Sequence, residues 1–261
     1  MDRLGYHLPI LMYHSVAFLF DAPFPECVRI RPSIFAKQMK YLKDHHYNVI
    51  EVDFLFQEIV EGRSLPPKTI AITLDDGYLD NYVNAYPILK FYGFPTTVFL
   101  ITGSIGIDPK FMTWDQVREM EKNGIRFGNH TVTHPHLHVA SLEGARKEIL
   151  EAKEKLSQEV QNPSQIFCYP FGEYTIACQR LVQECGYEGA VATSVDGALP
   201  LADRYAFRRL KISDSAQNKF IFAFEISGYY SAIKKIQKKI KYFKRHAVQV
   251  ALALFEFFQE V

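Results

Sequence analysis

Short apolar runs alternate with amphipathic segments between residues 10 and 212. This alternation is typical of βαβ units that build a mostly parallel sheet. Several of the runs are apolar throughout, as expected of strands that are covered on both faces. The runs predict strands over residues 10–13, 69–74, 96–101, 126–129, 166–169, 189–193 and 207–212, and the segments between them predict helices over 33–45, 79–91, 114–123, 141–160 and 175–185.

The segment over 141–160 carries the clearest helical pattern. Ser141 stands at the N-cap position, and an apolar stripe follows at helical spacing: Leu142, Ala145, Ile149, Ala152 and Leu156. A glycine directly follows three of the predicted helices, where a positive φ is favourable: Gly93, Gly124 and Gly186. With about seven β/α repeats and no long linker before residue 225, the pattern predicts one α/β domain, a barrel over residues 1–225.

The pattern changes after residue 226 to one or two amphipathic helices. Residues 226–261 hold seven Lys or Arg against two acidic residues, whereas the rest of the chain holds 23 against 27. A basic amphipathic helix can lie on an anionic membrane surface, which predicts peripheral membrane contact through residues 229–258. A helix packed on the barrel with a solvated lysine face explains the same pattern.

Composition narrows the class of protein. An apolar fraction of 48% over 261 residues excludes wholesale disorder, and a net charge of +1 gives no argument for a polyanionic partner such as nucleic acid. The four cysteines, at positions 27, 168, 178 and 185, are too irregularly spaced for a disulfide scaffold. We expect Cys178 and Cys185 to be packing residues. Without an apolar run of 18 residues or a secretory signal pattern, we expect a cytoplasmic protein. The predicted membrane contact would place it at the inner face of the membrane.

Polar clusters follow three of the predicted strands, at the end of a barrel where catalytic residues gather. The first is Thr73-Leu74-Asp75-Asp76-Gly77. Two adjacent carboxylates are costly unless a positive charge lies beside them. One of them can bind a metal ion while the other accepts a proton; alternatively, one caps the next helix and Gly77 makes the turn.

The second cluster is Asn129-His130-Thr131-Val132-Thr133-His134-Pro135. Two histidines at i and i+4 share a face if the segment is helical, and this is a common spacing of zinc ligands. One aspartate and two histidines leave a fourth position open, which is typical of catalytic sites. The alternative is a pair of surface or core histidines without a ligand.

The third cluster is Cys168-Tyr169-Pro170-Phe171-Gly172-Glu173-Tyr174. Its proline and glycine predict a tight loop, in which the Phe171 N–H is a candidate oxyanion donor. An ordinary turn is the alternative. Tyr169 and Tyr174, together with His136 beyond the second cluster, are candidate substrate contacts.

Taken in order, the three clusters resemble the motifs of the polysaccharide deacetylase family, also known as the NodB homology domain or carbohydrate esterase family four. The resemblance covers about residues 8–215, and the Leu-Met-Tyr-His-Ser run at 11–15 and Thr113-Trp114-Asp115 resemble the branch that acts on exported amino-sugar polymers. It implies a distorted (β/α)₇ barrel and metal-dependent N-deacetylation of an acetylated amino sugar.

The resemblance also implies roles for individual residues. Asp76, His130 and His134 would hold a divalent ion, with zinc the foremost candidate. Asp75 would be the general base, and the Phe171 N–H would share the charge of the tetrahedral intermediate. Thr131 and Thr133 would orient the two imidazoles.

Two departures from the family pattern raise further candidates. Family members often have an arginine that steadies the base where this chain has Cys168, so Arg208 and Arg209 are the candidate substitutes. Where the family has a Leu-x-His motif that supplies a general acid, this chain has Leu210-Lys211-Ile212. His14, at the end of the first predicted strand, is the candidate general acid, with His136 second.

We therefore predict a hydrolase that removes N-acetyl groups from a polysaccharide, an oligosaccharide or a lipid-linked glycan. A deformylase of a lipid-linked amino sugar could use the same catalytic groups. A barrel that binds sugar without catalysis is the alternative from another class. Nucleic acid is disfavoured as a partner because the excess cations are confined to residues 226–261.

Overall fold

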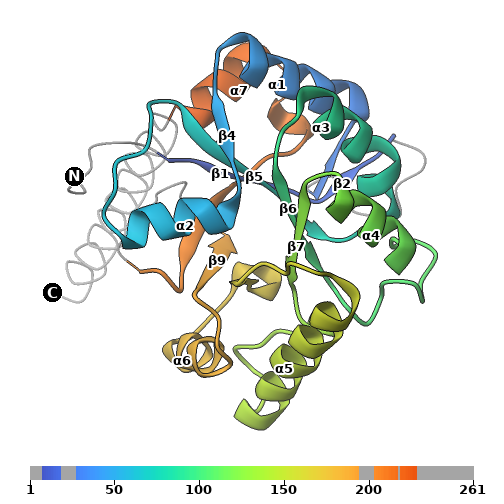
Figure 1. Ribbon diagram of the computed structural model, residues 1–261, viewed down its shortest axis with the longest axis vertical. Helices are drawn as coiled ribbons and strands as arrows, with labels where there is room; N and C mark the ends of the chain where they lie inside the picture. Colours follow the sequence, from blue (N-terminus) through green and yellow to red (C-terminus); the bar gives the residue numbers. More distant parts are fainter. Residues whose placement is uncertain (1–7, 19–27, 194–202, 217, 228–261) are drawn as a thin grey trace, which may run out of the picture.

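Seven parallel strands form a closed ring in the computed structural model, which describes residues 8–18, 28–193, 203–216 and 218–227. The ring consists of β1 (Ile10–Tyr13), β5 (Thr69–Asp76), β6 (Thr96–Leu100), β7 (Ile125–Asn129), β8 (Ile166–Cys168), β9 (Gly189–Thr193) and β10 (Phe207–Lys211). Leu11 of β1 is in register with Ile72 of β5 and with Leu210 of β10, which closes the barrel. The prediction of a single α/β domain built as a seven-stranded barrel is confirmed (Figure 1).

Three short strands lie outside the ring and were not predicted. β4 (Asn48–Ile50) pairs with the beginning of β5, and β2 (Ser15–Val16) pairs with β3 (Arg29–Ile30) in a separate two-stranded sheet. With two or three residues each, they are too short to show a hydrophobic period.

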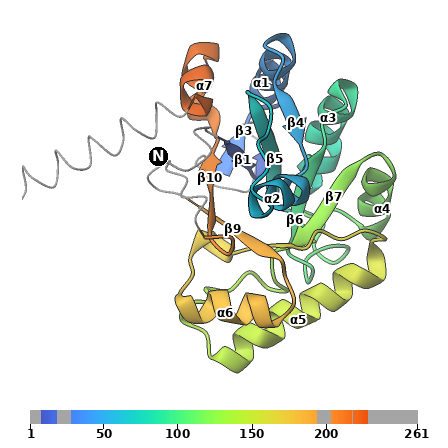
Figure 2. The same ribbon diagram turned by 60° about the vertical axis from the view of Figure 1, so that its left-hand side comes forward.

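Seven α-helices surround the strands within the described residues (Figure 1). They are α1 (Pro32–Asp44), α2 (Val52–Val60), α3 (Tyr86–Tyr92), α4 (Trp114–Lys122), α5 (Leu142–Glu159), α6 (Ile176–Glu184) and α7 (Lys219–Ile226). In Figure 2, α5 and α6 lie together, well apart from α1, α3 and α7. None of the helices in the described ranges is long and apolar enough to cross a membrane.

Differences from the predicted helices are local. Helix α2 was missed, and the helix expected over 79–91 begins as a π-helical segment, Asn81–Ala85, that continues into α3. Helix α7 crosses the predicted boundary between residues 225 and 226. The tail beyond Ser227 lies outside the described residues, so its predicted helices and membrane contact stay predictions.

The predicted ends of α5 and of three other helices are confirmed. The Ser141 side chain accepts a hydrogen bond from the Gly144 N–H, as an N-cap residue does. Gly93, Gly124 and Gly186 all have a positive φ, between 64° and 86°. In the predicted stripe, Ala145, Ile149, Ala152 and Leu156 are buried, whereas Leu142, the first residue of the helix, is exposed.

Most barrel strands are buried along their whole length, and all eight residues of β5 are inaccessible or nearly so. Cys178 and Cys185 are buried and free, which confirms that they are packing residues; Cys27 lies outside the described residues. A charged residue, Arg209, is among the largest fully buried side chains of the described residues. An arginine in this position needs an acidic partner.

Candidate active site at the carboxyl ends of the barrel strands

The carboxyl ends of the barrel strands surround a cavity of about 390 Å³. Strands β1, β5, β9 and β10 and the loops that follow β5, β7 and β8 all contribute to its wall. Candidate residues from all three sequence clusters and from β1 meet there: His14, Asp75, Asp76, His130, His134 and Phe171. The prediction that these motifs converge at one end of the barrel therefore agrees with the structure.

The backbone around this cavity is unusual. Six non-glycine residues within the described ranges have a positive φ, and four of them belong to the sequence clusters: Asp76 (76°), Thr131 (69°), His134 (60°) and Phe171 (58°). Such conformations cost free energy and persist where the surrounding structure enforces them, often at functional sites. At Asp76 the turn brings the second carboxylate to the same cavity as the first, although successive side chains on a strand point apart.

Asp76, His130 and His134 offer three ligand atoms to one point. Asp76 Oδ1 lies 3.5 Å from His130 Nε2 and 3.7 Å from His134 Nε2. Ligands about 2.0–2.2 Å from a tetrahedral ion lie about 3.3–3.6 Å from one another, so these separations fit. Oδ1 is buried and has no hydrogen-bond partner within the described residues. A divalent ion would satisfy this otherwise costly oxygen.

Hydrogen bonding and burial prepare both histidines to act as ligands. His130 Nδ1 donates to the Cys168 carbonyl at 2.8 Å, which leaves the Nε2 lone pair directed at Asp76. Burial lowers the pKa of His130 to about 3 and also lowers the pKa of His134. Both imidazoles are therefore neutral at pH 7, as metal binding requires.

The loop that carries these histidines is irregular, so the helix that would give them a shared face is not formed. Left-handed turns at Thr131 and His134 bring the two rings together, with centroids 4.7 Å apart. The threonines hold the loop and not the imidazoles: Thr131 accepts from the His134 N–H, and Thr133 donates to Glu148. Glu148 also accepts from two backbone N–H groups of the loop, a role that the sequence did not indicate.

Arg209 is the arginine that reaches Asp75. Its two terminal nitrogens donate to the two Asp75 oxygens, each at 2.6 Å, and they also contact Thr73 Oγ1 and Cys168 Sγ. Arg208, the other candidate, is the preceding residue of β10 and therefore points to the opposite face.

Burial alone would raise the pKa of the Asp75 carboxyl. The charge and hydrogen bonds of Arg209 outweigh that effect and hold the pKa well below its usual range. Asp75 is therefore ionised and fixed in orientation at neutral pH. Asp76 has no such partner, and burial raises its pKa.

A second set of three possible ligands overlaps the first, because Asp75, His130 and Cys168 also lie close together. Two observations disfavour it. Arg209 engages both oxygens of Asp75, and burial raises the pKa of the Cys168 thiol, which keeps it protonated. Thiolates and not thiols bind metals, so the triad of Asp76, His130 and His134 is the candidate metal site.

His14 directly follows β1 and lines the cavity beside the Asp75 carboxylate. Its Nε2 lies 3.9 Å from Asp75 Oδ2, and its side chain is 15% exposed. Burial lowers the pKa of His14, although the charges of Asp75 and Asp76 act in the opposite direction. A neutral His14 can accept a proton at a ring nitrogen before it donates one.

The loop after β8 contributes Phe171 and Gly172 to the cavity wall. The N–H groups of Gly172 and Glu173 bond to the carbonyls of Tyr169 and Pro170, whereas that of Phe171 has no backbone acceptor within the described ranges. A Cβ at Gly172 would lie 2.4 Å from the backbone nitrogen of Thr193, so this turn requires glycine.

The three candidate substrate contacts differ in position. Tyr169 is fully buried at the cavity wall, with its ring stacked on Tyr174 at 5.2 Å between centroids. Tyr174 and His136 are not among the residues that line the cavity; His136 instead bonds to Glu173 on the outer rim. Sequence reasoning missed two other lining residues, Tyr78 and Lys211.

Tyr78 and Lys211 could have been suspected from their positions. Tyr78 follows the Asp-Asp-Gly run directly, and it forms a hydrogen bond with Asp76. Lys211 ends β10, two residues after Arg209, and so shares its face of the strand.

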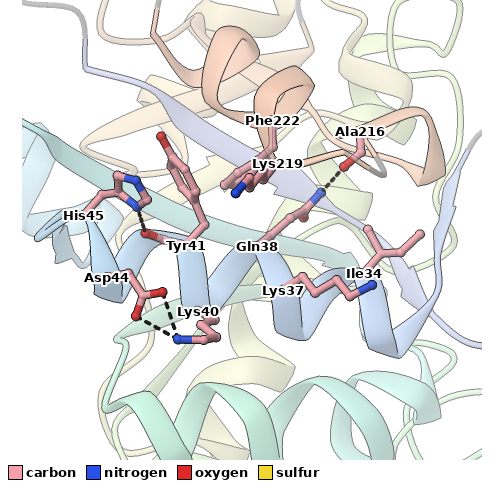
Figure 3. Close-up of a pocket in the computed structure, with 10 residues that line it drawn as sticks. All are labelled: Ile34, Lys37, Gln38, Lys40, Tyr41, Asp44, His45, Ala216, Lys219 and Phe222. Atoms are coloured by element: carbon pink, nitrogen blue, oxygen red, sulfur yellow. Dashed lines mark hydrogen bonds and ion pairs between the residues drawn. The ribbon is translucent and has the colours of Figure 1, made fainter.

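A second cavity of about 390 Å³ lies on the outside of the barrel between α1 and α7 (Figure 3). The acidic residue and the histidine of this cavity both form hydrogen bonds with neighbours on α1. Lys40 donates to Asp44, and Nδ1 of His45, the C-cap residue, donates to the Tyr41 carbonyl. This cavity lacks the converging carboxylate and imidazole atoms of the first, so the candidate chemistry lies at the end of the barrel.

A parallel barrel with an arginine-bound carboxylate and a candidate metal triad at its carboxyl end is an arrangement suited to metal-assisted hydrolysis. A family model described as polysaccharide deacetylase matches residues 62–190. The YxkH protein of Bacillus subtilis (strain 168), described as a candidate polysaccharide deacetylase, is 31% identical over 206 residues, which are 79% of this chain and 71% of that protein. The chain belongs to the polysaccharide deacetylase family.

Two further relatives carry more specific names. The poly-beta-1,6-N-acetyl-D-glucosamine N-deacetylase of Staphylococcus aureus (strain MSSA476) is 27% identical over 202 residues, which cover 72% of this chain and 69% of that protein. The structure of the Streptococcus pyogenes deacetylase PplD in complex with acetate has a TM-score of 0.73 and 27% identity, and covers 79% of this chain and 92% of that chain. Membership in this family makes the chain a carbohydrate deacetylase.

Proposed function

We propose that this enzyme is a zinc-dependent N-deacetylase of a polymer or oligomer that contains N-acetylglucosamine. The observation that carries the proposal is the placement of the Asp76, His130 and His134 triad beside the arginine-held Asp75 in one cavity. The S. aureus relative, named for poly-beta-1,6-N-acetyl-D-glucosamine, and the S. pyogenes relative, solved with acetate, support an acetylated amino sugar as the substrate.

In this mechanism the cavity provides a general base, Asp75, that can accept a proton from the attacking water. A divalent ion held by Asp76, His130 and His134 would lower the pKa of a water molecule and polarise the amide carbonyl. Asp75 is ionised and oriented by Arg209, so one of its oxygens can accept the proton of the attacking water. The Phe171 N–H is the candidate donor to the oxyanion.

The C–N bond then breaks, and the amine nitrogen needs a proton. His14 Nε2 is 3.9 Å from Asp75 Oδ2, close enough for a small movement to join them. We assign His14 to receive the proton from Asp75 and deliver it to the amine nitrogen. The water supplies the hydroxyl group of the released acetic acid and, through Asp75 and His14, the proton that the amine nitrogen gains, so atoms and protons balance.

Replacing His14 tests its role as the proton carrier. We expect His14→Gln to lower kcat by about 10²-fold, within the range of general acid–base contributions, while KM changes little. Bound zinc should be unchanged, because His14 is not one of the triad. His46→Asn, an exposed substitution on another face, is the control. A kcat equal to that of the original protein would remove His14 from the mechanism.

The acyl group and the sugar are tested together by product analysis. The zinc-loaded protein is incubated with β-1,6-linked and β-1,4-linked N-acetylglucosamine oligomers and with an N-formylated counterpart, and acetate, formate and free amine are measured. We expect acetate and an equal amount of amine, with the β-1,6-linked oligomers preferred. Faster release of formate would favour the deformylase, and sugar binding without release would favour a binding protein.

Location and membrane contact stay proposals. We propose a cytoplasmic protein with peripheral membrane contact through residues 229–258, on the charge pattern described above. Helix α7, which leads into that segment, exposes the large apolar side chains of Phe220, Ile221 and Phe224. Sedimentation of the full chain with vesicles that contain or lack anionic lipid tests this contact.

A further inference from the structure

A second cluster of ligand-type side chains lies on the outer rim of the active site. It consists of His136, His138 and Glu173, whose ligand atoms all lie within 4.8 Å of one another. His136 Nδ1 is 2.8 Å and His138 Nδ1 is 3.1 Å from the same oxygen, Glu173 Oε2. The three side chains are 35–51% exposed, so an ion could reach them from solvent.

The two histidines and the glutamate come from different loops. His136 and His138 belong to the loop between β7 and α5, whereas Glu173 belongs to the loop between β8 and α6. The imidazole planes are nearly perpendicular, at 87°, with centroids 5.7 Å apart. The rings approach Glu173 from two directions. The nitrogen–oxygen separations of 2.8 and 3.1 Å are hydrogen-bond distances, so an ion would move the three side chains apart, to the separation of about 3.3–3.6 Å between tetrahedral ligands.

The cluster is in contact with the catalytic cavity through one aromatic ring. The Phe171 ring stacks on His136, with centroids 3.9 Å apart and planes 12° apart. It also lies against His134, with centroids 4.4 Å apart and planes at 62°. An ion that joined the two loops would fix His136 and with it the Phe171 segment. Phe171 has a positive φ and carries the candidate oxyanion donor.

We propose that His136, His138 and Glu173 form a second zinc site, separate from the Asp76 triad. Two imidazole nitrogens and one carboxylate oxygen are a ligand set that suits zinc, and a tetrahedral ion would keep one position open for water or a sugar hydroxyl. The site ties the two loops together at the entrance of the cavity. It does not depend on the identity of the proposed substrate.

The number of zinc ions bound per chain tests this proposal. The full-length protein is stripped with a chelator, dialysed against micromolar free zinc, and analysed for bound metal. We expect two zinc ions per chain. His138→Asn and Glu173→Gln should each bind one, Asp76→Asn should bind one, and the combination of Asp76→Asn with His138→Asn should bind none. His46→Asn, with an exposed histidine altered elsewhere, should bind two.

Cobalt substitution gives a second readout that does not rely on activity. Cobalt in tetrahedral nitrogen and oxygen coordination absorbs visible light, and the Asp76→Asn protein should keep a band that the double variant lacks. One zinc ion per chain, unaffected by His138→Asn or Glu173→Gln, would overturn the second site. A different result would separate the two proposals. If the zinc contents are as expected but the original protein releases no acetate, the proposed function fails while the second zinc site stands.

Discussion

Replacement of Asp75 with asparagine should abolish most of the deacetylase activity, with an expected fall in kcat of about 10²- to 10⁴-fold. The carboxylate is ionised because Arg209 holds its pKa well below the usual range. An asparagine keeps the shape of the side chain and one acceptor for Arg209, but its amide cannot accept a proton from water. The measurement is acetate release from an N-acetylated oligosaccharide under saturating substrate.

Two controls make the Asp75→Asn result specific. Bound zinc should be the same as in the original protein, because the triad lies on Asp76, His130 and His134. Asp53→Asn alters a different acidic residue, which accepts hydrogen bonds from Ser164 and Gln165 outside the cavity, and should leave kcat close to its original value. Full activity in Asp75→Asn would remove this residue as the base.

Replacement of Arg209 with methionine should destabilise the fold by about 3–5 kcal/mol at neutral pH, because it leaves the Asp75 charge buried without its partner. Arg209 is 1% exposed, and its two hydrogen bonds to Asp75 are charge-assisted. The free energy of unfolding in urea measures the effect. Arg208→Met is the matched control on the same strand, and its expected change is within about 0.5 kcal/mol.

The loss of stability in Arg209→Met should depend on pH. Without the arginine, burial raises the pKa of Asp75 in the folded protein above its value in the unfolded chain. A group with a raised folded pKa favours the folded state at low pH, and this contribution is lost as the pH rises through that pKa. The difference from the original protein should therefore shrink as the solution is acidified. An equal difference at all pH values would mean that the Asp75 charge is not its cause.

The residues of the active site could be predicted from sequence because they follow apolar strands. Strands that are buried on both faces, such as β5, form runs of mostly apolar residues, which can be recognised in the sequence. A parallel barrel brings the residues that follow these strands to one end. This reasoning located Asp75, Asp76, His130 and His134 in one cavity. The sequence did not decide between Arg208 and Arg209, because Phe207 and Leu210 offer one apolar residue to each face of β10. The structure places Arg209 with Phe207 on the inner face.

Other features had no signal in the sequence. The positive φ values of Asp76, Thr131 and His134 have no marker in the local sequence. Asp and His enter the left-handed region more readily than most residues, but nothing in the pattern shows that these particular positions adopt it. The two histidines therefore converge as predicted, but through left-handed turns and not on the helix that the sequence left open. The pairing of Glu173 with His136 and His138 joins two loops that are 35 residues or more apart in the chain, and no local pattern marks it.

Metal dependence of acetate release tests the central claim most directly. The protein is stripped with a chelator and assayed on N-acetylglucosamine oligomers before and after zinc is restored, beside His130→Ala treated in the same way. The account predicts that release by the original protein is lost on stripping and recovered with zinc, and that His130→Ala shows little release in either state. Release that survives complete removal of metal, or normal release by zinc-treated His130→Ala, would contradict it.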